Sequence, residues 1–201
     1  MLVAAGSFAQ VQPAPILNRD YVRIAPPLPA ARGDRIEVIE FFYYGCPICY
    51  ELEPMFSRWS ANAPGDVVVR RVPALISANW ENFARLYYAL EALGEVTRLN
   101  WLVYEAIHFD EVSLNEEPVM LKWLSGKGID AEKFLEIYRS PAVAAKLAEA
   151  RELIRRYGVK GVPSIAVDSK FLTSARTAGG TPQLMPLVDR LIELARKDRA
   201  Q

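Results

Sequence analysis

Cysteine and histidine are scarce in this chain: its 201 residues include two cysteines and one histidine. A zinc site draws about four ligands from Cys, His or carboxylate groups, so few such sites can be built here. Net charge is absent as well, because 24 Lys and Arg balance 24 Asp and Glu. A chain whose field sums to zero is not expected to take nucleic acid or an anionic membrane as its main partner.

Long apolar runs are also missing. No stretch of about 18 consecutive apolar residues occurs, so the sequence predicts no membrane-spanning helix. Hydrophobic residues still make up 51% of the chain, enough to build a core in one domain or in one domain with an insert. The first nine residues, which end in Ser7-Phe8-Ala9, are interpreted either as the remnant of an export signal or as a simple N-terminal extension.

Strands and helices alternate at both ends of the chain, and helices alone fill the middle. Strands are predicted at 36–44, 66–72, 163–168 and 170–173. Helices are predicted at 47–59 and, with Thr181 as its cap, from Thr181 to about Lys197. Helical spacing dominates from about 77 to 157, where Ser140 is expected to cap a helix that ends at Gly158. The predicted class is therefore α/β: a frame of residues 20–75 and 151–201, a helical insert at 76–150, and an N-terminal extension at 1–19.

Both cysteines fall in one Cys-x-x-Cys motif, Cys46 and Cys49, and three uses of the pair are open. As a structural staple it would close a loop of about four residues, which stabilises by ~2 kcal/mol at best. As a zinc site it lacks a second pair, and the lone His108 lies at the end of a predicted helix, where a packing role is the common one. As a redox pair it fits its surroundings.

Those surroundings are a buried strand before the motif and a helix after it. The strand delivers Cys46 to the helix N-terminus, where unpaired N–H groups and the helix dipole favour a thiolate. Cys49 follows one helical turn later and is placed deeper. Cys46 is therefore the predicted nucleophile and Cys49 the thiol that resolves a mixed disulfide.

Three stretches resemble the DsbA group of disulfide oxidases within the thioredoxin superfamily: Glu40-Phe41-Phe42, Cys46-Pro47-Ile48-Cys49-Tyr50 and Gly161-Val162-Pro163. The resemblance implies a thioredoxin fold with an inserted α-helical domain. It also implies that Pro163 is cis and faces the cysteines, with Val162 pairing with an extended substrate strand. Pro54 matches a helix-bending proline of thioredoxins, for which we expect no chemical role.

Glu40 matches an acid that lies under the cysteine pair in many relatives. Such a carboxyl would have a raised pKa and could carry the Cys49 proton. A solvated glutamate at the end of a strand is the alternative reading.

The same resemblance implies a function. We expect an exported, periplasmic, monomeric oxidase without cofactor or metal that donates its disulfide to unfolded exported polypeptides and is reoxidised by a DsbB-like inner-membrane partner. The alternatives are an isomerase or reductase of the same fold, which would usually need an added dimerisation domain, a peptide-binding holdase with Phe171 and Leu172 as groove walls, and a glutathione-dependent isomerase of small molecules. Relatives of the last kind usually lack the second cysteine, which is present here.

Ile48 departs from the best-known members of that group, which carry histidine between Pro and the second Cys. Isoleucine neither donates to a thiolate nor attracts it. The pKa of Cys46 is therefore predicted to lie below that of a free thiol and above that of the His-bearing relatives. A lost contact worth ~1.5 to 3 kcal/mol would make the protein less oxidising by tens of millivolts.

Overall fold

The computed structural model describes residues 13–26 and 34–200. The interpretation of residues 1–9 as a signal remnant lies outside this part of the chain. In the described residues the strands are β1 (Val22–Arg23), β2 (Ile36–Phe42), β3 (Val67–Pro73), β4 (Ser164–Val167) and β5 (Phe171–Ser174). The helices are α1 (Pro47–Ala61), η1 (Ala78–Trp80), α2 (Glu81–Ala92), α3 (Val96–His108), α4 (Glu117–Gly126), α5 (Ala131–Tyr138), α6 (Pro141–Tyr157), α7 (Ala175–Ala178) and α8 (Thr181–Arg199).

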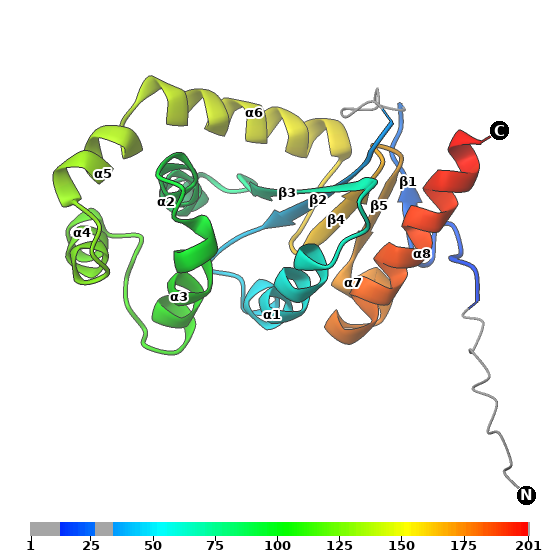
Figure 1. The fold of residues 1–201 in the computed structure, drawn as a ribbon, viewed down its shortest axis with the longest axis horizontal. Helices are drawn as coiled ribbons and strands as arrows, with labels where there is room; N and C mark the ends of the chain where they lie inside the picture. Colours follow the sequence, from blue (N-terminus) through cyan, green and yellow to red (C-terminus); the bar gives the residue numbers. More distant parts are fainter. Residues whose placement is uncertain (1–12, 27–33, 201) are drawn as a thin grey trace, which may run out of the picture.

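The strands form one mixed sheet in the order β1-β5-β4-β2-β3 (Figure 1). β2 and β3 are parallel and are joined through α1, whereas β4 runs antiparallel to β2 and to β5. Every residue of β2 is buried, as expected for a central strand that is covered on both faces. The predicted α/β class with a helical insertion is confirmed. The short edge strand β1 was not predicted, because it lies in a proline-rich segment.

Two apolar clusters hold the sheet between layers of helices. On one face, β2 and β4 pack against α1 and α8, with Val38, Ile165, Phe56 and Leu191 almost fully buried. The second cluster joins alternate residues of β2, such as Phe41, to the helices of the insertion. Each fully buried side chain of this size contributes roughly 1.5 to 3 kcal/mol before the entropy of ordering is counted.

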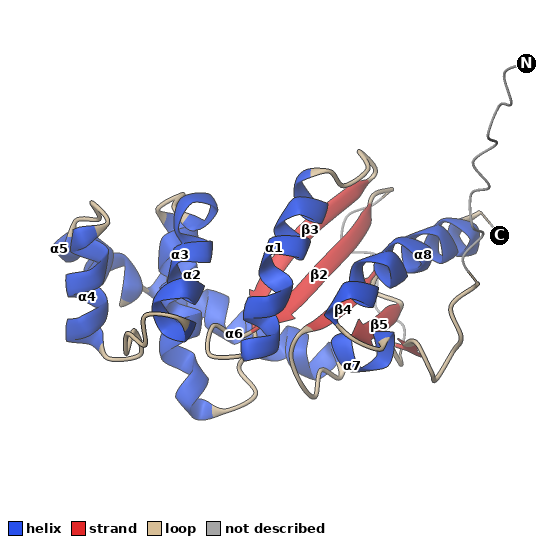
Figure 2. Ribbon diagram, turned by 90° about the horizontal axis from the view of Figure 1, so that it is seen from below, coloured by secondary structure: helices blue, strands red, loops and turns tan. Residues whose placement is uncertain are grey.

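Helices α2 to α5 gather at one end of the molecule, and α6 runs back from them to the sheet (Figure 1). Figure 2 shows the same group set to one side while α1 and α8 lie over the strands. The Ser140 side chain caps α6 by accepting from the Val143 N–H, and Gly158 ends the helix with a φ of 64°, as the sequence predicts. Because α6 is continuous from Pro141 to Tyr157, the predicted boundary between residues 150 and 151 falls inside one helix. The division into frame and insert stays a prediction.

Two details of helices differ from the sequence prediction. Helix α8 takes Gly180 as its N-cap, so Thr181 is its first residue, and the Thr181 hydroxyl donates to the Glu51 carboxylate of α1 instead of capping its own helix. Helix α1 contains Pro54, as predicted, and ends at Ala61, two residues beyond the predicted end at residue 59. Among the described residues, no helix is both long and apolar enough to cross a membrane.

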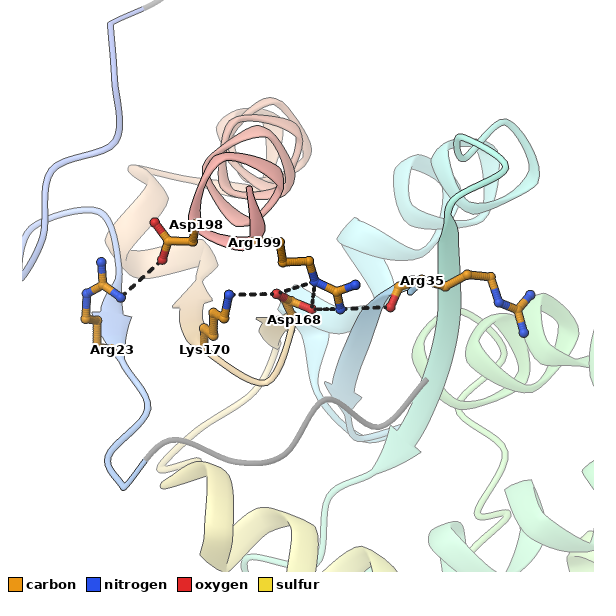
Figure 3. A network of polar contacts seen from close by, with 6 residues as sticks. All are labelled: Arg23, Arg35, Asp168, Lys170, Asp198 and Arg199. Atoms are coloured by element: carbon orange, nitrogen blue, oxygen red, sulfur yellow. Dashed lines mark hydrogen bonds and ion pairs between the residues drawn. The ribbon is translucent and has the colours of Figure 1, made fainter. Parts of the chain in front are cut away.

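The far end of α8 is fixed by a buried ion pair (Figure 3). Arg199 donates from Nε to Asp168 at 3.0 Å, and Lys170 approaches the same carboxylate at 3.3 Å. Arg199 also reaches the backbone oxygen of Arg35 at 3.0 Å. Asp168 lies in the three-residue turn between β4 and β5, with a φ of 56°. This end of the sheet is the one farthest along β2 from the cysteines, because the Asp168 N–H pairs with the Glu37 oxygen near the start of that strand.

Candidate active site

The two cysteines lie where β2 passes into α1. Cys46 is the N-cap residue of the helix, and its sulfur accepts from the backbone N–H of Cys49 at 3.3 Å. Pro47 occupies the first helical turn, where its missing N–H leaves no hydrogen bond unmade. The cap therefore puts the Cys46 sulfur at the positive end of the helix dipole, as predicted.

The two thiols differ in depth. Cys49 is fully buried, at 0% exposure, whereas Cys46 is only partly buried. One helical turn separates them, so Cys49 sits beneath Cys46 and away from solvent. Both are free thiols in this structure. A visiting molecule can reach the first sulfur and not the second.

Their acidities differ in the same sense. A hydrogen bond from the Cys49 side chain, helped by the backbone N–H groups of Cys49 and Ile48, lowers the pKa of Cys46 to about 6 against the opposing effect of burial. Burial raises the pKa of Cys49 far above its ordinary value, and the neighbouring Cys46 adds to that shift. The lowered pKa of Cys46 agrees with the prediction from the helix N-terminus. Its ranking against His-bearing relatives stays a prediction.

A distant segment completes the surface around Cys46. Its thiol points at the backbone oxygen of Val162, 3.7 Å away, and the Val162–Pro163 peptide bond is cis. Ile48, which is 44% exposed, lines one groove together with Val162 and Pro163. The structure thus brings together the residues that the sequence singled out, although more than a hundred positions separate them.

Glu40 lies beneath the cysteines and is 1% exposed, which excludes the reading as a solvated strand-end acid. The parallel register sets it opposite Arg71 of β3, whose Nε donates to Glu40 Oε2 at 3.1 Å. The second carboxylate oxygen, Oε1, has no hydrogen-bond partner among the described residues. Burial outweighs the attraction of Arg71 and, with some repulsion from Glu53, raises the pKa of Glu40 to about 7.

Arg71 and Glu53 were not singled out from the sequence. Arg71 divides its guanidinium among Glu40, Glu53 at 2.8 Å and Ser57 at 2.8 Å. Two successive arginines in an otherwise apolar strand were the available signal, yet only the pairing of β2 with β3 shows which of them faces the acids. Arg70 instead bonds Glu149 of α6.

Aromatic rings surround the motif on its other side. Tyr43 stacks on Trp80 at 3.9 Å between ring centroids. A Cβ at Gly45 would come within 2.6 Å of the Tyr43 ring, so a larger residue there would have to displace this ring from its place on Trp80. His108 is the last residue of α3 and stacks on Tyr50, with 5.0 Å between the ring centroids. Its Nε2 lies 2.7 Å from the backbone oxygen of Tyr44. The histidine therefore has the packing role expected of it.

Over 13–26 and 34–200 no group of three or more Cys, His, Asp or Glu is placed to hold a metal.

A thioredoxin-type sheet with a helical insertion, and a Cys-x-x-Cys pair at its strand–helix junction, define a thiol:disulfide oxidoreductase. The chain belongs to the family of DSBA-like thioredoxin domains, whose model matches residues 37–185.

Relatives and solved structures agree with that assignment. The chain is 38% identical over 183 residues to the thiol:disulfide interchange protein DsbA of Pseudomonas aeruginosa, covering 91% of this chain and 85% of that protein. It is 37% identical over 197 residues to the protein of the same name from Azotobacter vinelandii, covering 97% and 92%. A crystal structure of Pseudomonas aeruginosa DsbA superimposes with a TM-score of 0.87 at 37% identity, covering 91% of this chain and 95% of that one.

Proposed function

We propose that this oxidoreductase works as a dithiol oxidase, donating a Cys46–Cys49 disulfide to folding polypeptides. The observation that carries the proposal is the contrast between the accessible Cys46, with its pKa of about 6, and the buried Cys49, whose pKa is strongly raised. A thiol of low pKa is a good leaving group and a stable thiolate. Stabilising that thiolate stabilises the reduced protein, which makes its disulfide a stronger oxidant.

The reaction takes two exchanges. A substrate thiolate attacks the Cys46 sulfur, the Cys46–Cys49 bond breaks, and Cys49 leaves as a thiolate that takes up a proton. The second substrate thiolate then attacks the substrate sulfur of the mixed disulfide and releases Cys46 as a thiolate. Two electrons pass to the protein, and the substrate gains one disulfide.

Glu40 is proposed as the relay for the Cys49 proton. Its carboxyl is buried, its pKa is raised to about 7, and it interacts electrostatically with Cys49. A group that titrates near neutral pH can give a proton and regain it at little cost. Glu40 would therefore protonate the departing Cys49 thiolate during substrate oxidation and accept the proton back on reoxidation.

Val162 and Pro163 are proposed to hold the substrate chain. The Val162 oxygen lies beside the Cys46 sulfur, and both residues line the groove that reaches the motif. Backbone pairing at Val162 would align an extended segment without reading its side chains. Such pairing suits an enzyme that accepts many unfolded chains.

The setting of the reaction is proposed from the relatives, which are named thiol:disulfide interchange proteins. The protein would act as a monomer in the bacterial periplasm on exported polypeptides, without a cofactor. A DsbB-like inner-membrane partner would restore the Cys46–Cys49 disulfide after each turnover.

Trapping the intermediate tests this function. With Cys49→Ser, the sulfur that would resolve the mixed disulfide is missing, so a peptide thiol activated as a disulfide should stay bound to Cys46 and appear as a stable adduct in mass spectrometry. The matched variant Cys46→Ser should form none, because Cys49 is buried. Adducts on Cys49, or failure of the wild-type disulfide form to oxidise a dithiol peptide, would refute the proposal.

A further inference from the structure

A groove of about 600 Å³ begins at Ile48 and Val162 and extends away from the thiols. Its walls are the end of α6 with the segment that follows, strand β5, helix α7 and strand β1. The groove therefore connects the place where substrate sulfur must arrive with a surface large enough to hold several more residues of a bound chain.

The floor of the groove includes Leu172, Thr173 and Ser174 of β5. Leu172 is half-buried and supplies its apolar part, whereas Phe171 is buried and does not line the groove. Phe171 is thus a core residue, and only Leu172 serves as a wall. Val22 and Ile48 add exposed apolar surface at 43% and 44% exposure. Such a floor suits the apolar side chains of an extended peptide.

The rim of the groove is cationic. Five of the described residues that line it are basic and none is acidic, although the whole chain has no net charge. The five are Arg23, Arg155, Arg156, Lys160 and Arg176. Cations gathered around a concave apolar surface raise its local potential far more than the balanced total suggests.

Two of the five cations are already paired. Arg155 holds Glu152 at 2.6 Å, and Arg23 approaches Asp198 at 3.4 Å. The other three, Arg156, Lys160 and Arg176, are exposed and form no ion pair with a described residue. Three positive charges outside these ion pairs, beside apolar lining residues, complement a ligand that has carboxylates next to apolar side chains.

We propose that this groove selects cysteine-containing segments with Asp or Glu beside apolar residues, so that acidic segments are oxidised faster than neutral or basic ones. The proposal rests on the oxidase function proposed above and names its preferred substrate class. The chemistry is unchanged: two peptide thiols become a disulfide while the Cys46–Cys49 disulfide becomes two thiols.

Three dithiol peptides with the same cysteine spacing and apolar residues, flanked by Glu, Gln or Lys, test the selection. At low ionic strength, kcat/KM for oxidation of the Glu peptide should exceed that for the Lys peptide by roughly tenfold, with the Gln peptide between them. The preference should shrink at high salt, where exposed charges are screened. Equal rates for the three peptides, or a preference that salt leaves unchanged, would overturn the proposal.

A matched pair of variants locates the effect. Lys160→Gln/Arg176→Gln removes two groove charges and should bring the ratio of Glu to Lys peptide rates to within about threefold of one. Lys122→Gln/Lys133→Gln removes two exposed charges from α4 and α5, away from the groove, and should leave the ratio unchanged. An equal loss in both variants would show that the overall field, and not the groove, does the selecting.

Binding without chemistry separates this proposal from the one it rests on. Cys46→Ser/Cys49→Ser cannot exchange disulfides, yet fluorescence anisotropy should still show tighter binding of a labelled Glu peptide than of the Lys peptide. Acidic preference in binding, with no oxidation by the wild type, would refute the oxidase function and leave the groove assignment standing. Oxidation without any preference in binding would refute the groove assignment alone.

Discussion

A buried carboxylate lies beside an arginine at each end of the central sheet, and the two carboxylates differ in how many of their oxygens have a hydrogen-bond partner. Asp168, at the end away from the thiols, accepts from Arg199 with both oxygens and also has Lys170 at 3.3 Å. Glu40, at the thiol end, has one oxygen on Arg71 and the other without a partner among the described residues. Arg71 in turn divides its charge between Glu40 and Glu53.

That difference separates two kinds of buried carboxylate. The Asp168 carboxylate, with both oxygens bonded to Arg199, fastens the α8 end to the β4–β5 turn (Figure 3). A buried carboxylate with an unpaired oxygen pays for desolvation with a pKa near 7. A carboxylate beside an arginine therefore fastens two elements at one end of the sheet, and at the other end it is the group with the raised pKa that we propose as the proton relay.

Removing the Cys46 sulfur should abolish catalysis at the thiol end of the sheet and leave the ion pair at the Asp168 end unchanged. Cys46→Ser is expected to reduce dithiol exchange to the uncatalysed rate, because the buried Cys49 cannot meet a substrate. The change is nearly isosteric and only partly buried. At pH 5, where the Cys46 thiol is protonated, the unfolding free energy of the reduced protein should therefore change by less than about 1 kcal/mol. Peptide oxidation rates and urea unfolding check both statements, and residual catalysis would contradict the first.

Removing the Asp168 carboxylate, at the other end of the sheet, should lower stability and leave the exchange chemistry unchanged. Asp168→Asn leaves Arg199 and Lys170 without their shared carboxylate partner. Because both cations are partly exposed, the unfolding free energy should fall by about 2 kcal/mol. Asparagine tolerates the φ of 56° at this position, so the turn itself should persist. Exchange activity below the melting transition should stay at the wild-type rate.

Asp198→Asn serves as the control for that experiment. It removes the exposed contact to Arg23 at 3.4 Å, for which a loss below about 1 kcal/mol is expected. Equal losses in the two variants would show that the buried pair at Asp168 is worth no more than a surface contact.

Neutralising Glu40 should change how stability depends on pH. The pKa of this carboxyl rises on folding from 4.5 to about 7, so its contribution to stability is full below pH 4.5 and is lost as the pH rises through 7. In Glu40→Gln this loss cannot occur. The unfolding free energy of the reduced variant minus that of the wild type should therefore increase by roughly 2 to 3 kcal/mol between pH 4.5 and 8.

Urea unfolding of both reduced proteins across that pH range measures the difference directly. The titration of Cys46 occurs in both proteins and cancels in the subtraction. Parallel stability curves would contradict the raised pKa of Glu40 and, with it, the proposed proton relay.

Ile48→His is expected to have the smallest effect of these changes, a shift in the redox potential of the Cys46–Cys49 pair. An imidazole beside Cys46 can donate to its thiolate, which lowers the pKa of that thiol further and stabilises the reduced form. The redox potential should become more oxidising by roughly 30 to 60 mV. Equilibration with glutathione at pH 7 measures the shift, and Ile48→Leu should leave the potential unchanged. A shift toward reducing values in Ile48→His would contradict the account of Ile48.

The parts of this molecule that depend on local sequence could be predicted. The apolar run before the motif is β2, Asp130 and Ser140 cap their helices, and Cys46 sits at the helix N-terminus. Each of these follows from residues within one element and its neighbours. The nearness of Val162 and Pro163 to Cys46 came from family resemblance, since nothing local fixes it.

The parts that depend on strand pairing could not be predicted. Whether Glu40 was buried or solvated stayed open because an acid in an otherwise apolar strand fits both. Arg71 becomes its partner only through the parallel register of β2 and β3. The cationic groove is assembled from four separate segments, whose charges balance elsewhere in the chain and so leave no trace in the composition.

The thiol end of the sheet is expected to favour the reduced state. The difference in stability between the oxidised and reduced proteins tests this most directly. The thermal unfolding of the oxidised and reduced proteins is compared at pH 7, with the redox equilibrium against glutathione measured in parallel. Because the lowered pKa of Cys46 stabilises its thiolate, the reduced form should melt at the higher temperature and the disulfide should oxidise glutathione readily. An oxidised form more stable by a few kcal/mol would contradict the oxidase account and favour a reductase.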